Sequence, residues 1–486
     1  MPVNSTHADY DASASAWARS RVVIAGEDAV KRAGVRYLRR LDEQTDAEYA
    51  AYKSRAAFFN ATARTADGFV GMIFRRAPFV RLPDEASSVG KAMARFAHDV
   101  DMLGTSLFGY AKNVVTEVIS VGRAGTLVDW EGEVEDRVYL STYAAENILN
   151  WRVERVNGRN IVTLVVLREE VEARRTADAD EFEDEPVEQI RVLKLVQSPK
   201  SKVEGKRRDY ECVVEIWRRG VGGNRRTARS GWKLIETRSP LRRGKPLPSL
   251  PFVFHGPRHS RPAVDKLPLG DIIAVNLDHY RLDSDYKHGI HFTALPTAWV
   301  SGFDKNSVLR IGSSTAWVTE TPGATAGFLE FTGQGLTTFE RAMDRDERLM
   351  AVLGSRVLSE QKKVGETADA IELRQSGENS ILSTISLSVG ESLMQVLRWA
   401  YWWNSTEETP EVVGPDQVTF TLNTDFSTKG MASDELKSVV AAWQAGAVSR
   451  ETMQEIFRKG EILPDGLSAQ DNGTFVPAAR INGKLK

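Results

Sequence analysis

Apolar positions in the first quarter of the chain recur every three or four residues, which is the spacing of one face of an α-helix. Two such stripes are present, one formed by Tyr49, Tyr52, Ala56, Phe59 and Ala63 and the other by Met93, Phe96, Val100 and Leu103. Residues 107–121 continue this rhythm, so the pattern predicts helices over 22–122. The first twenty residues are mostly polar and predict a flexible arm.

The periodicity changes near residue 123 to the alternation that is typical of half-buried strands. Strands are predicted at 189–195, 210–216 and 231–236, and the region 123–256 is expected to be β-rich. An acidic segment, 178–185, precedes the first of these strands, and two basic segments separate the three strands. We interpret the charged segments as solvated loops.

Helical spacing returns at 267–290, where Pro268 suits a first helical turn. Residues 296–335 are rich in Gly, Thr and Trp and predict a small β module. Thr337 and Glu340 have the spacing of a capping box at the start of the next helix. A polar link at 359–365 then precedes a long apolar stripe at Ile381, Ile385, Val389, Leu393 and Leu397.

Charge and cysteine content narrow the classes of function. The 64 Lys and Arg residues nearly balance the 66 Asp and Glu residues, which argues against a protein that coats nucleic acid non-specifically. Cys212 is the single cysteine, so neither a disulfide framework nor a Cys-based zinc site is expected. Because no apolar run reaches about 18 residues and no signal-peptide core is present, we expect a soluble intracellular protein without membrane partners.

The motifs of common catalytic sites are missing from the sequence. It contains no phosphate-binding loop, no dinucleotide fingerprint, no H-E-x-x-H and no G-x-S-x-G elbow. The remaining candidate groups have simpler explanations. We interpret His255 and His259 as loop histidines, and Cys212 as a core thiol. The residues interpreted as part of a helix surface are His279, His288, His291, Asp278, Asp283 and Asp285, and those interpreted as core or subunit-interface packing are Trp399, Trp402 and Trp403. We therefore predict no catalytic residue, no metal and no cofactor.

One arrangement of segments is distinctive. A helix carrying Asn276 and Tyr280 leads into Pro296, a β module closes near Phe328, and a charged helix ends at Gly354. A short loop and a long helix follow. This order resembles that of the portal proteins, or head-to-tail connectors, of tailed bacteriophages. Further similar segments include 49–56, 60–64, 71–74, 122–129, 143–151, 423–426 and 443–449, so that the resemblance covers about 20–465.

The resemblance implies an α+β portal-protein fold with a mixed helical and β wing, two stem helices flanking a β-rich clip, and a short helical crown. The expected divisions are a flexible arm at 1–20, the wing at 21–265 (helical 22–122, β-rich 123–256), the first stem helix at 266–295, the clip at 296–335, the second stem helix at 336–358, the tunnel loop at 359–365, the long helix and closing wing strand at 366–425, the crown at 430–465 and a flexible tail at 466–486.

The resemblance also implies a function. Portal subunits form a ring, usually of about twelve copies, at one capsid vertex of the virion after assembly in the host cytoplasm. Double-stranded DNA passes through the ring without sequence specificity, while the terminase large subunit, adaptor and tail proteins, and capsid and scaffolding proteins are the expected partners. The implied site residues are Gln361, Lys362 and Lys363 in the tunnel loop, Trp299, Trp317 and Phe328 in the clip interface, and Asn276, Tyr280, Arg345 and Arg348 in the stem.

Two other interpretations remain open from the sequence. The chain could be another structural or adaptor protein of a phage head, although the stem, clip and stem order argues against it. It could also be a nucleic-acid-processing enzyme, but that class needs clustered carboxylates or a lysine-bearing phosphate loop, and neither is visible.

Overall fold

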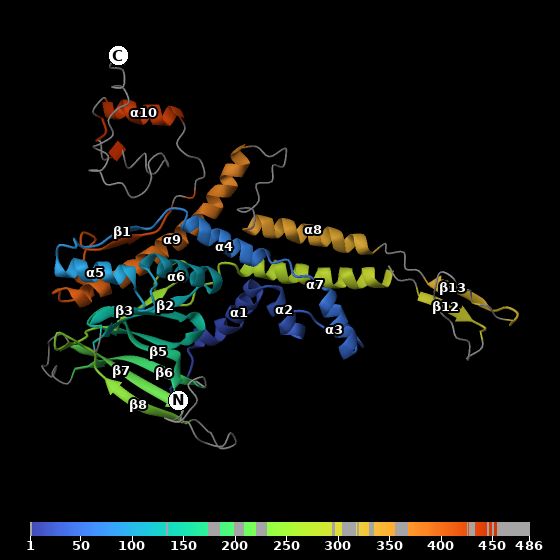
Figure 1. Cartoon of the computed structure of the whole chain (residues 1–486), viewed down its shortest axis with the longest axis horizontal. Helices are drawn as coiled ribbons and strands as arrows, with labels where there is room; N and C mark the ends of the chain where they lie inside the picture. Colours follow the sequence, from blue (N-terminus) through green and yellow to red (C-terminus); the bar gives the residue numbers. More distant parts are fainter. Residues whose placement is uncertain are drawn as a thin grey trace, which may run out of the picture.

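The fold combines helices and strands throughout its length (Figure 1). The structure is a computed structural model. The residues that it describes are 2–132, 135–173, 185–198, 209–219, 231–293, 297–303, 317, 320–329, 335–354, 368–424, 426, 433–444, 447–449 and 452–453. Of the predicted segments, the tunnel loop (359–365), residues 466–486 and nearly all of the acidic segment (178–185) lie outside the described residues.

Helices dominate the chain as far as residue 121. They are α1 (Ala8–Ala25), α2 (Glu27–Ala33), the 3-10 turn η1 (Gly34–Arg36), α3 (Asp46–Arg55), α4 (Ala61–Ile73), α5 (Ser88–His98) and α6 (Leu107–Val121). Both predicted stripes contribute buried side chains, among them Tyr52 and Met93, but Leu103 is 87% exposed because it follows the end of α5. A capping box does occur here, at Thr45 and Glu48, and it starts α3.

The prediction of a flexible arm at 1–20 is wrong, because most of that segment is α1. The helix is polar overall, but it buries Trp17 and Val23 against the body. Arg21 of α1 also forms ion pairs with Glu117 at 2.7 Å and Glu146 at 3.0 Å. A few large contacts therefore fix a helix whose sequence carries almost no amphipathic signal.

Two main sheets follow the helices. A three-stranded sheet has the order β11-β2-β3, and a five-stranded antiparallel sheet runs β4-β5-β6-β7-β8. The strands are β2 (Ala124–Glu131), β3 (Arg137–Ala144), β4 (Ile148–Val156), β5 (Arg159–Ala173), β6 (Glu185–Gln197), β7 (Tyr210–Arg219), β8 (Trp232–Arg238) and β11 (Phe252–His255), with a 3-10 turn η2 (Ala145–Asn147) and a small ladder of β9 (Leu241–Arg242) and β10 (Lys245–Pro246). The three strands predicted from alternation correspond to β6, β7 and β8.

A two-residue turn fixes the register at the start of the five-stranded sheet. Asn157 and Gly158 both have positive φ, at 50° and 83°, and they join Val156 to its partner Arg159. Left-handed φ at both positions is the requirement of the hairpin turn that matches strand twist, and Asn-Gly is the pair that meets it at least cost.

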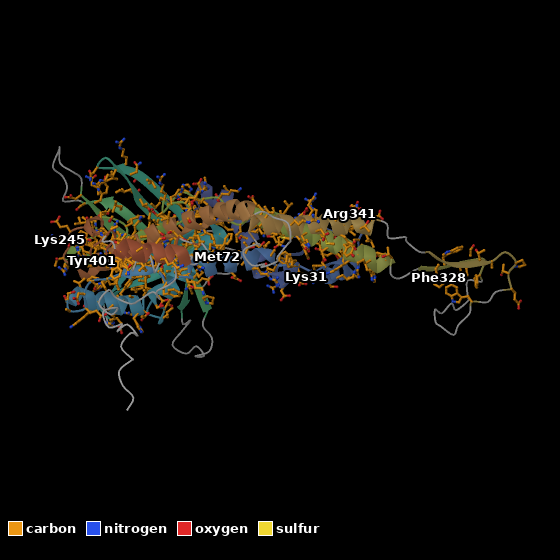
Figure 2. All side chains as sticks on the ribbon, turned by 90° about the horizontal axis from the view of Figure 1, so that it is seen from above. Lys31, Met72, Lys245, Phe328, Arg341 and Tyr401 are labelled. Carbon is orange, nitrogen blue, oxygen red and sulfur yellow. The ribbon has the colours of Figure 1, made fainter. Side chains whose placement is uncertain are left out.

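The second half of the chain supplies the most extended part of the molecule. Figure 1 shows α7 and α8 side by side and leading away from the body, with a two-stranded sheet at their far end, and Figure 2 shows the same arrangement from above. The elements are α7 (Gly270–Thr293), β12 (Thr297–Ser301), β13 (Thr325–Leu329), α8 (Leu336–Leu353), α9 (Ala368–Asn404), η4 (Pro410–Val412), β14 (Thr419–Thr421), which pairs with β1 (Phe79–Arg81), and α10 (Ser433–Gln444).

Two local predictions in this half are corrected. The capping box at Thr337 does not form, because the N-cap of α8 is Gly335, two residues before Thr337, and the helix begins at Leu336. In the long stripe, Ile381 is 55% exposed whereas the other four residues are buried, and Leu382 is buried in its place. Of the predicted crown, α10 is described, and most of the second helix lies outside the described residues.

The core forms where α9 crosses the three-stranded sheet. This helix contacts all three strands of that sheet, and also α4, α5 and α6. Trp399, Trp402 and Trp403 are all buried near its end, which confirms their predicted packing role, and Cys212 is buried in the core as predicted. No described helix combines the length and the apolar character that a membrane crossing requires.

Candidate functional site: the paired helices and their tip

Helices α7 and α8 pack antiparallel in a constant register along much of their length. His279 Nε2 lies 3.5 Å from Glu347 Oε1, and further along the pair the Tyr286 hydroxyl donates to Glu340 Oε1 at 2.6 Å. Near the far end, Gly289 lies so close to Leu336 that an added Cβ would be 2.7 Å from its Cδ2 atom. The two helices therefore act as one rod, which we call the stem.

The base of the stem is anchored to the body through Asn276, one of the predicted stem residues. It is fully buried, and its Oδ1 accepts hydrogen bonds from the Thr62 amide at 3.2 Å and the Thr62 hydroxyl at 2.8 Å. Its Nδ2 donates to the Phe59 carbonyl at 2.7 Å. Both polar atoms of the Asn276 side chain, Oδ1 and Nδ2, therefore hold α7 to α4 and to the turn before α4.

Tyr280 packs beside this anchor and is 1% exposed. Its ring meets Phe58 edge-on with centroids 5.8 Å apart, and burial raises the pKa of its hydroxyl to about 12. The structure therefore places Asn276 and Tyr280 in the interior of the chain, where they position the stem and do not face solvent.

The three aspartates of α7 are not simply a solvated face, as the sequence predicted. Asp283 Oδ2 accepts from the Ala57 amide at 2.7 Å and lies 3.2 Å from Lys287 Nζ. Asp285 accepts a hydrogen bond from the Tyr52 hydroxyl. Asp278 is exposed and fits the prediction. Two of the three aspartates therefore tie α3 and the segment after it to the stem.

The outer face of α8 carries a row of arginines. Arg345 and Arg348, both predicted stem residues, have side chains 68% and 74% exposed, and their nearest carboxylates are Asp346 at 3.4 Å and Asp344 at 3.8 Å. Arg341 is also exposed and precedes them by four and seven residues, so the three share one helix face. Arg341 was not among the predicted stem residues, although its spacing of four and seven residues from Arg345 and Arg348 is visible in the sequence.

The far end of the stem carries β12 and β13, which we call the tip. Trp299 pairs with Gly327 across the two strands, and its ring lies against the glycine, with Nε1 3.1 Å from the position of an added Cβ. Phe328 follows Gly327 and therefore points to the opposite face, where its ring centroid is 6.2 Å from that of Trp317. Trp299 and Phe328 are 46% and 55% exposed, so each face of the tip presents an uncovered aromatic side chain.

The predicted tunnel-loop residues Gln361, Lys362 and Lys363 lie in segment 355–367, which is outside the described residues. This segment connects α8 to α9.

The histidines occupy different environments from those expected. His255 was predicted to be a loop residue, but it ends the buried strand β11, where α9 covers it, and it is 0% exposed. His288 lies 3.2 Å from an Arg55 guanidinium nitrogen, and burial together with that cation lowers its pKa. Within the described ranges, no group of three His, Cys, Asp or Glu side chains has an arrangement that could hold a metal ion.

A family model described as a domain of unknown function, DUF4055, matches residues 268–404, which is less than half of the chain. The match begins just before α7 and ends with α9, so it spans the stem, the tip and the long helix. None of the curated proteins matches the sequence.

Among solved structures, the chain is similar to proteins of a gene transfer agent (GTA) particle. A chain of the native virion is 11% identical over 91% of this chain and 99% of its own length, with a TM-score of 0.38. A chain from the neck of the empty particle, computed with C6 symmetry, is 10% identical over 87% and 95%, with a TM-score of 0.39. A chain from the neck of the native particle, computed with C12 symmetry, is 9% identical over 90% and 99%, with a TM-score of 0.36.

Proposed function

We propose that this chain is a portal subunit of a tailed-phage-like particle. In this proposal several copies form a ring at one vertex of the capsid, and the stems surround a channel for double-stranded DNA. The observation that carries the proposal is the stem itself, a pair of antiparallel helices that projects from a mixed body, bears a small β module at its end and leads on to the long helix α9. This is the order of parts on which the sequence resemblance rests.

Uncovered apolar side chains on the stem support assembly with other copies. Leu349, Val352 and Leu353 near the end of α8 are 42%, 48% and 40% exposed, and Phe292 near the end of α7 is 53% exposed. The first three lie at the base of the stem, next to the body, and Phe292 lies at its far end. Apolar side chains exposed on a projecting element favour a covering partner, because burying them removes apolar area from water. Neighbouring stems in a ring would cover them.

The arginine row on α8 supports a wall that can contact DNA without retaining it. Arg341, Arg345 and Arg348 are exposed, but Asp344 and Glu347 lie beside them on the same helix. Each phosphate contact adds to affinity and to salt dependence, so interspersed carboxylates weaken retention of a sliding duplex. Gln361, Lys362 and Lys363 are assigned by resemblance to the narrowest part of the channel.

The tip is proposed to be the docking surface for the terminase large subunit during packaging and for adaptor or tail proteins afterwards. A two-stranded sheet cannot bury side chains on both faces by itself, and here Trp299 and Phe328 are exposed on opposite faces. In this proposal the chain hydrolyses nothing, and the energy for DNA movement comes from the docked motor.

Negative-stain imaging and native mass spectrometry of the purified full-length chain test the proposal. A ring with a central hole and a mass of about twelve subunits is expected. A monomer or dimer at micromolar concentration in several salts would count against a portal and in favour of the second candidate, another head or adaptor protein.

A further inference from the structure

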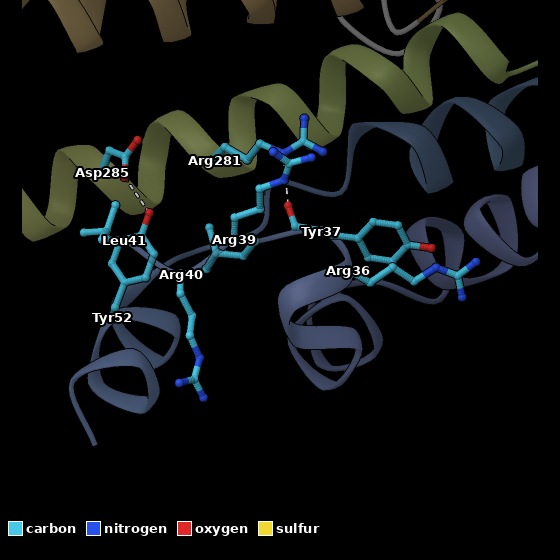
Figure 3. Close-up of a pocket in the computed structure, with 9 residues that line it drawn as sticks. Arg36, Tyr37, Arg39, Arg40, Leu41, Tyr52, Arg281 and Asp285 are labelled. Carbon is cyan, nitrogen blue, oxygen red and sulfur yellow. Dashed lines mark hydrogen bonds between the residues drawn. The ribbon is translucent and has the colours of Figure 1, made fainter. Parts of the chain in front are cut away.

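A cavity of about 450 Å³ lies where the segment between η1 and α3 crosses the side of α7 (Figure 3). Its walls carry four arginines, three from the short segment after α2 and one from α7: Arg36, Arg39, Arg40 and Arg281. Among the described residues that line it, Asp285 is the one carboxylate. Figure 3 shows the guanidinium groups of Arg39 and Arg281 next to each other. A concave surface that gathers cations from two elements focuses positive potential on its interior.

The carboxylates near the cavity compensate part of this charge. Asp285 accepts the hydrogen bond from Tyr52, and Asp46 pairs with Arg40. Arg281 donates its Nε–H to the Tyr37 carbonyl at 3.0 Å, and its Nη1 is 3.9 Å from Asp278, with both side chains about half exposed.

Arg39 makes no hydrogen bond or ion pair with any described residue, although it shares the cavity wall with three other arginines. Grouping like charges raises the free energy of the folded chain unless an anion is also present. The guanidinium group binds phosphate oxygens through two parallel N–H donors, which makes phosphate the best-matched anion for this wall.

We propose that this cavity is a binding site for phosphate groups, with Arg39 and Arg281 as the principal ligands. The phosphate could be supplied by a free oligophosphate or by the backbone of a nucleic acid, and the same guanidinium chemistry serves both. The inference rests on the cavity and its charges, so it is independent of the proposed role in a ring.

The test uses the full-length protein at about 0.15 M salt with two probes. Calorimetry measures the binding of inorganic pyrophosphate, and fluorescence anisotropy measures the binding of a short labelled DNA duplex. Because Arg39 has no partner within the described structure, Arg39→Gln removes charge with little risk to folding. We expect Arg39→Gln to lower the affinity for the probe that binds by about tenfold or more, as the loss of a charge-assisted hydrogen bond does.

Two further variants sharpen the result. Arg39→Lys keeps the charge but loses the planar pair of donors, so it should weaken binding by less than Arg39→Gln. Arg152 lies exposed on β4 outside the cavity, and Arg152→Gln is the matched control, which should bind as the unmodified chain does. If Arg39→Gln loses pyrophosphate binding, the ligand is identified as a free oligophosphate. If it loses duplex binding alone, the ligand is identified as a nucleic-acid backbone. If neither probe binds, or if Arg39→Gln and Arg152→Gln behave alike, the proposal is overturned.

Discussion

Buried polar side chains join the helices to the sheets, and His255 is fully enclosed among them. Its Nε2 is 2.6 Å from the Thr126 hydroxyl, which is 2.7 Å from the Tyr110 hydroxyl, and its Nδ1 is 2.7 Å from the Ser392 hydroxyl. Ser392 donates to the Val389 carbonyl, so its oxygen must accept from Nδ1–H, and Nε2 accepts from Thr126. The network fits a neutral imidazole and has no place for a second ring proton.

This network predicts a pH dependence of stability. Burial lowers the pKa of His255 to about 3, whereas the unfolded chain titrates near the ordinary value of 6.5. As the pH falls below about 6.5, the unfolded state binds a proton that the folded state does not, so the stabilising contribution is lost progressively down to about pH 3. The contribution falls by at most about 1.4 kcal/mol per pH unit.

The measurement compares the free energy of unfolding of the unmodified chain and of His255→Gln across this pH window. The difference between the two proteins should change as the pH falls, because the variant lacks the titrating group. A difference that stays constant between about pH 7.5 and pH 4.5 would contradict the assignment of a depressed pKa.

The Asn276 anchor gives a second prediction at the residue scale. Asn276→Leu keeps similar bulk but leaves the Thr62 amide, the Thr62 hydroxyl and the Phe59 carbonyl without their buried partner. Each unpaired buried group costs about 1 to 3 kcal/mol, so we expect a loss of about 3 kcal/mol or more in the free energy of unfolding by urea. Asp278→Ala on the exposed side of the same helix is the control and should stay within about 0.5 kcal/mol. Equal effects of the two changes would rule out the anchoring role.

Single-residue environments were the hardest features to predict from sequence. His255 is followed by Gly256 and Pro257, and that pattern favours a loop. Its burial depends on Ser392 and Thr126, which are far away in the sequence. Asn276 could be assigned to a helix, but its partner Thr62 could not be identified, because no local pattern encodes a contact between distant segments.

At the scale of elements, the stem could be predicted well and the N-terminal helix could not. The predicted helix at 267–290 is observed at Gly270–Thr293, because its apolar stripe is regular and Pro296 limits its length. α1 was missed because its stability comes from Trp17, Val23 and the Arg21 ion pairs rather than from periodicity. The adjacent residues Asn157 and Gly158 are a recognisable hairpin signal, from which the turn between β4 and β5 could have been predicted.

The tip gives a prediction at this scale. Because Phe328 is exposed, Phe328→Ser should change the stability of the isolated subunit little, while it removes apolar area that a partner or a neighbouring subunit would cover. Trp317→Ala, beside it, should act in the same way. We expect either change to weaken ring assembly or docking of a tail-side partner at least about tenfold, as the loss of an aromatic interface residue does.

Sedimentation of the subunit across a concentration series measures assembly, and binding of a purified terminase or adaptor measures docking. Thr325→Ala, an exposed change on the same strand, is the control. Unchanged assembly and unchanged docking for both aromatic variants would show that this face of the tip is not an interface.

At the scale of the whole molecule, the sequence predicted the order of the parts more successfully than their contacts. The order of body, stem, tip, stem and long helix followed from periodicity and from the resemblance. The packing of α9 across the three-stranded sheet joins β2, β3 and β11, which are widely separated from it in the sequence. Long-range packing of this kind depends on side-chain fit between segments, which one sequence does not reveal.

Neither a disulfide nor a metal ion is expected to hold copies of the chain together in the proposed ring. Cys212 is the single cysteine of the chain, its thiol is buried, and burial raises its pKa to about 12, so it stays protonated and inaccessible to disulfide exchange. Within the described ranges no side-chain group is arranged to hold a metal ion. In the proposed ring we therefore expect contacts between copies to rest on apolar burial and on hydrogen bonds or ion pairs such as the exposed stem residues offer.

We therefore expect the assembled species to keep its mass in native mass spectrometry after treatment with a reductant and with a metal chelator. Cys212→Ser, which cannot form a disulfide, should assemble to the same size, provided that thermal unfolding shows the buried hydroxyl to be tolerated. Moderate denaturant, which weakens apolar burial, should dissociate the proposed ring before it unfolds the subunits if the contacts between copies bury less area than the core. Dissociation by reductant or chelator alone would show that a covalent or metal link joins the copies.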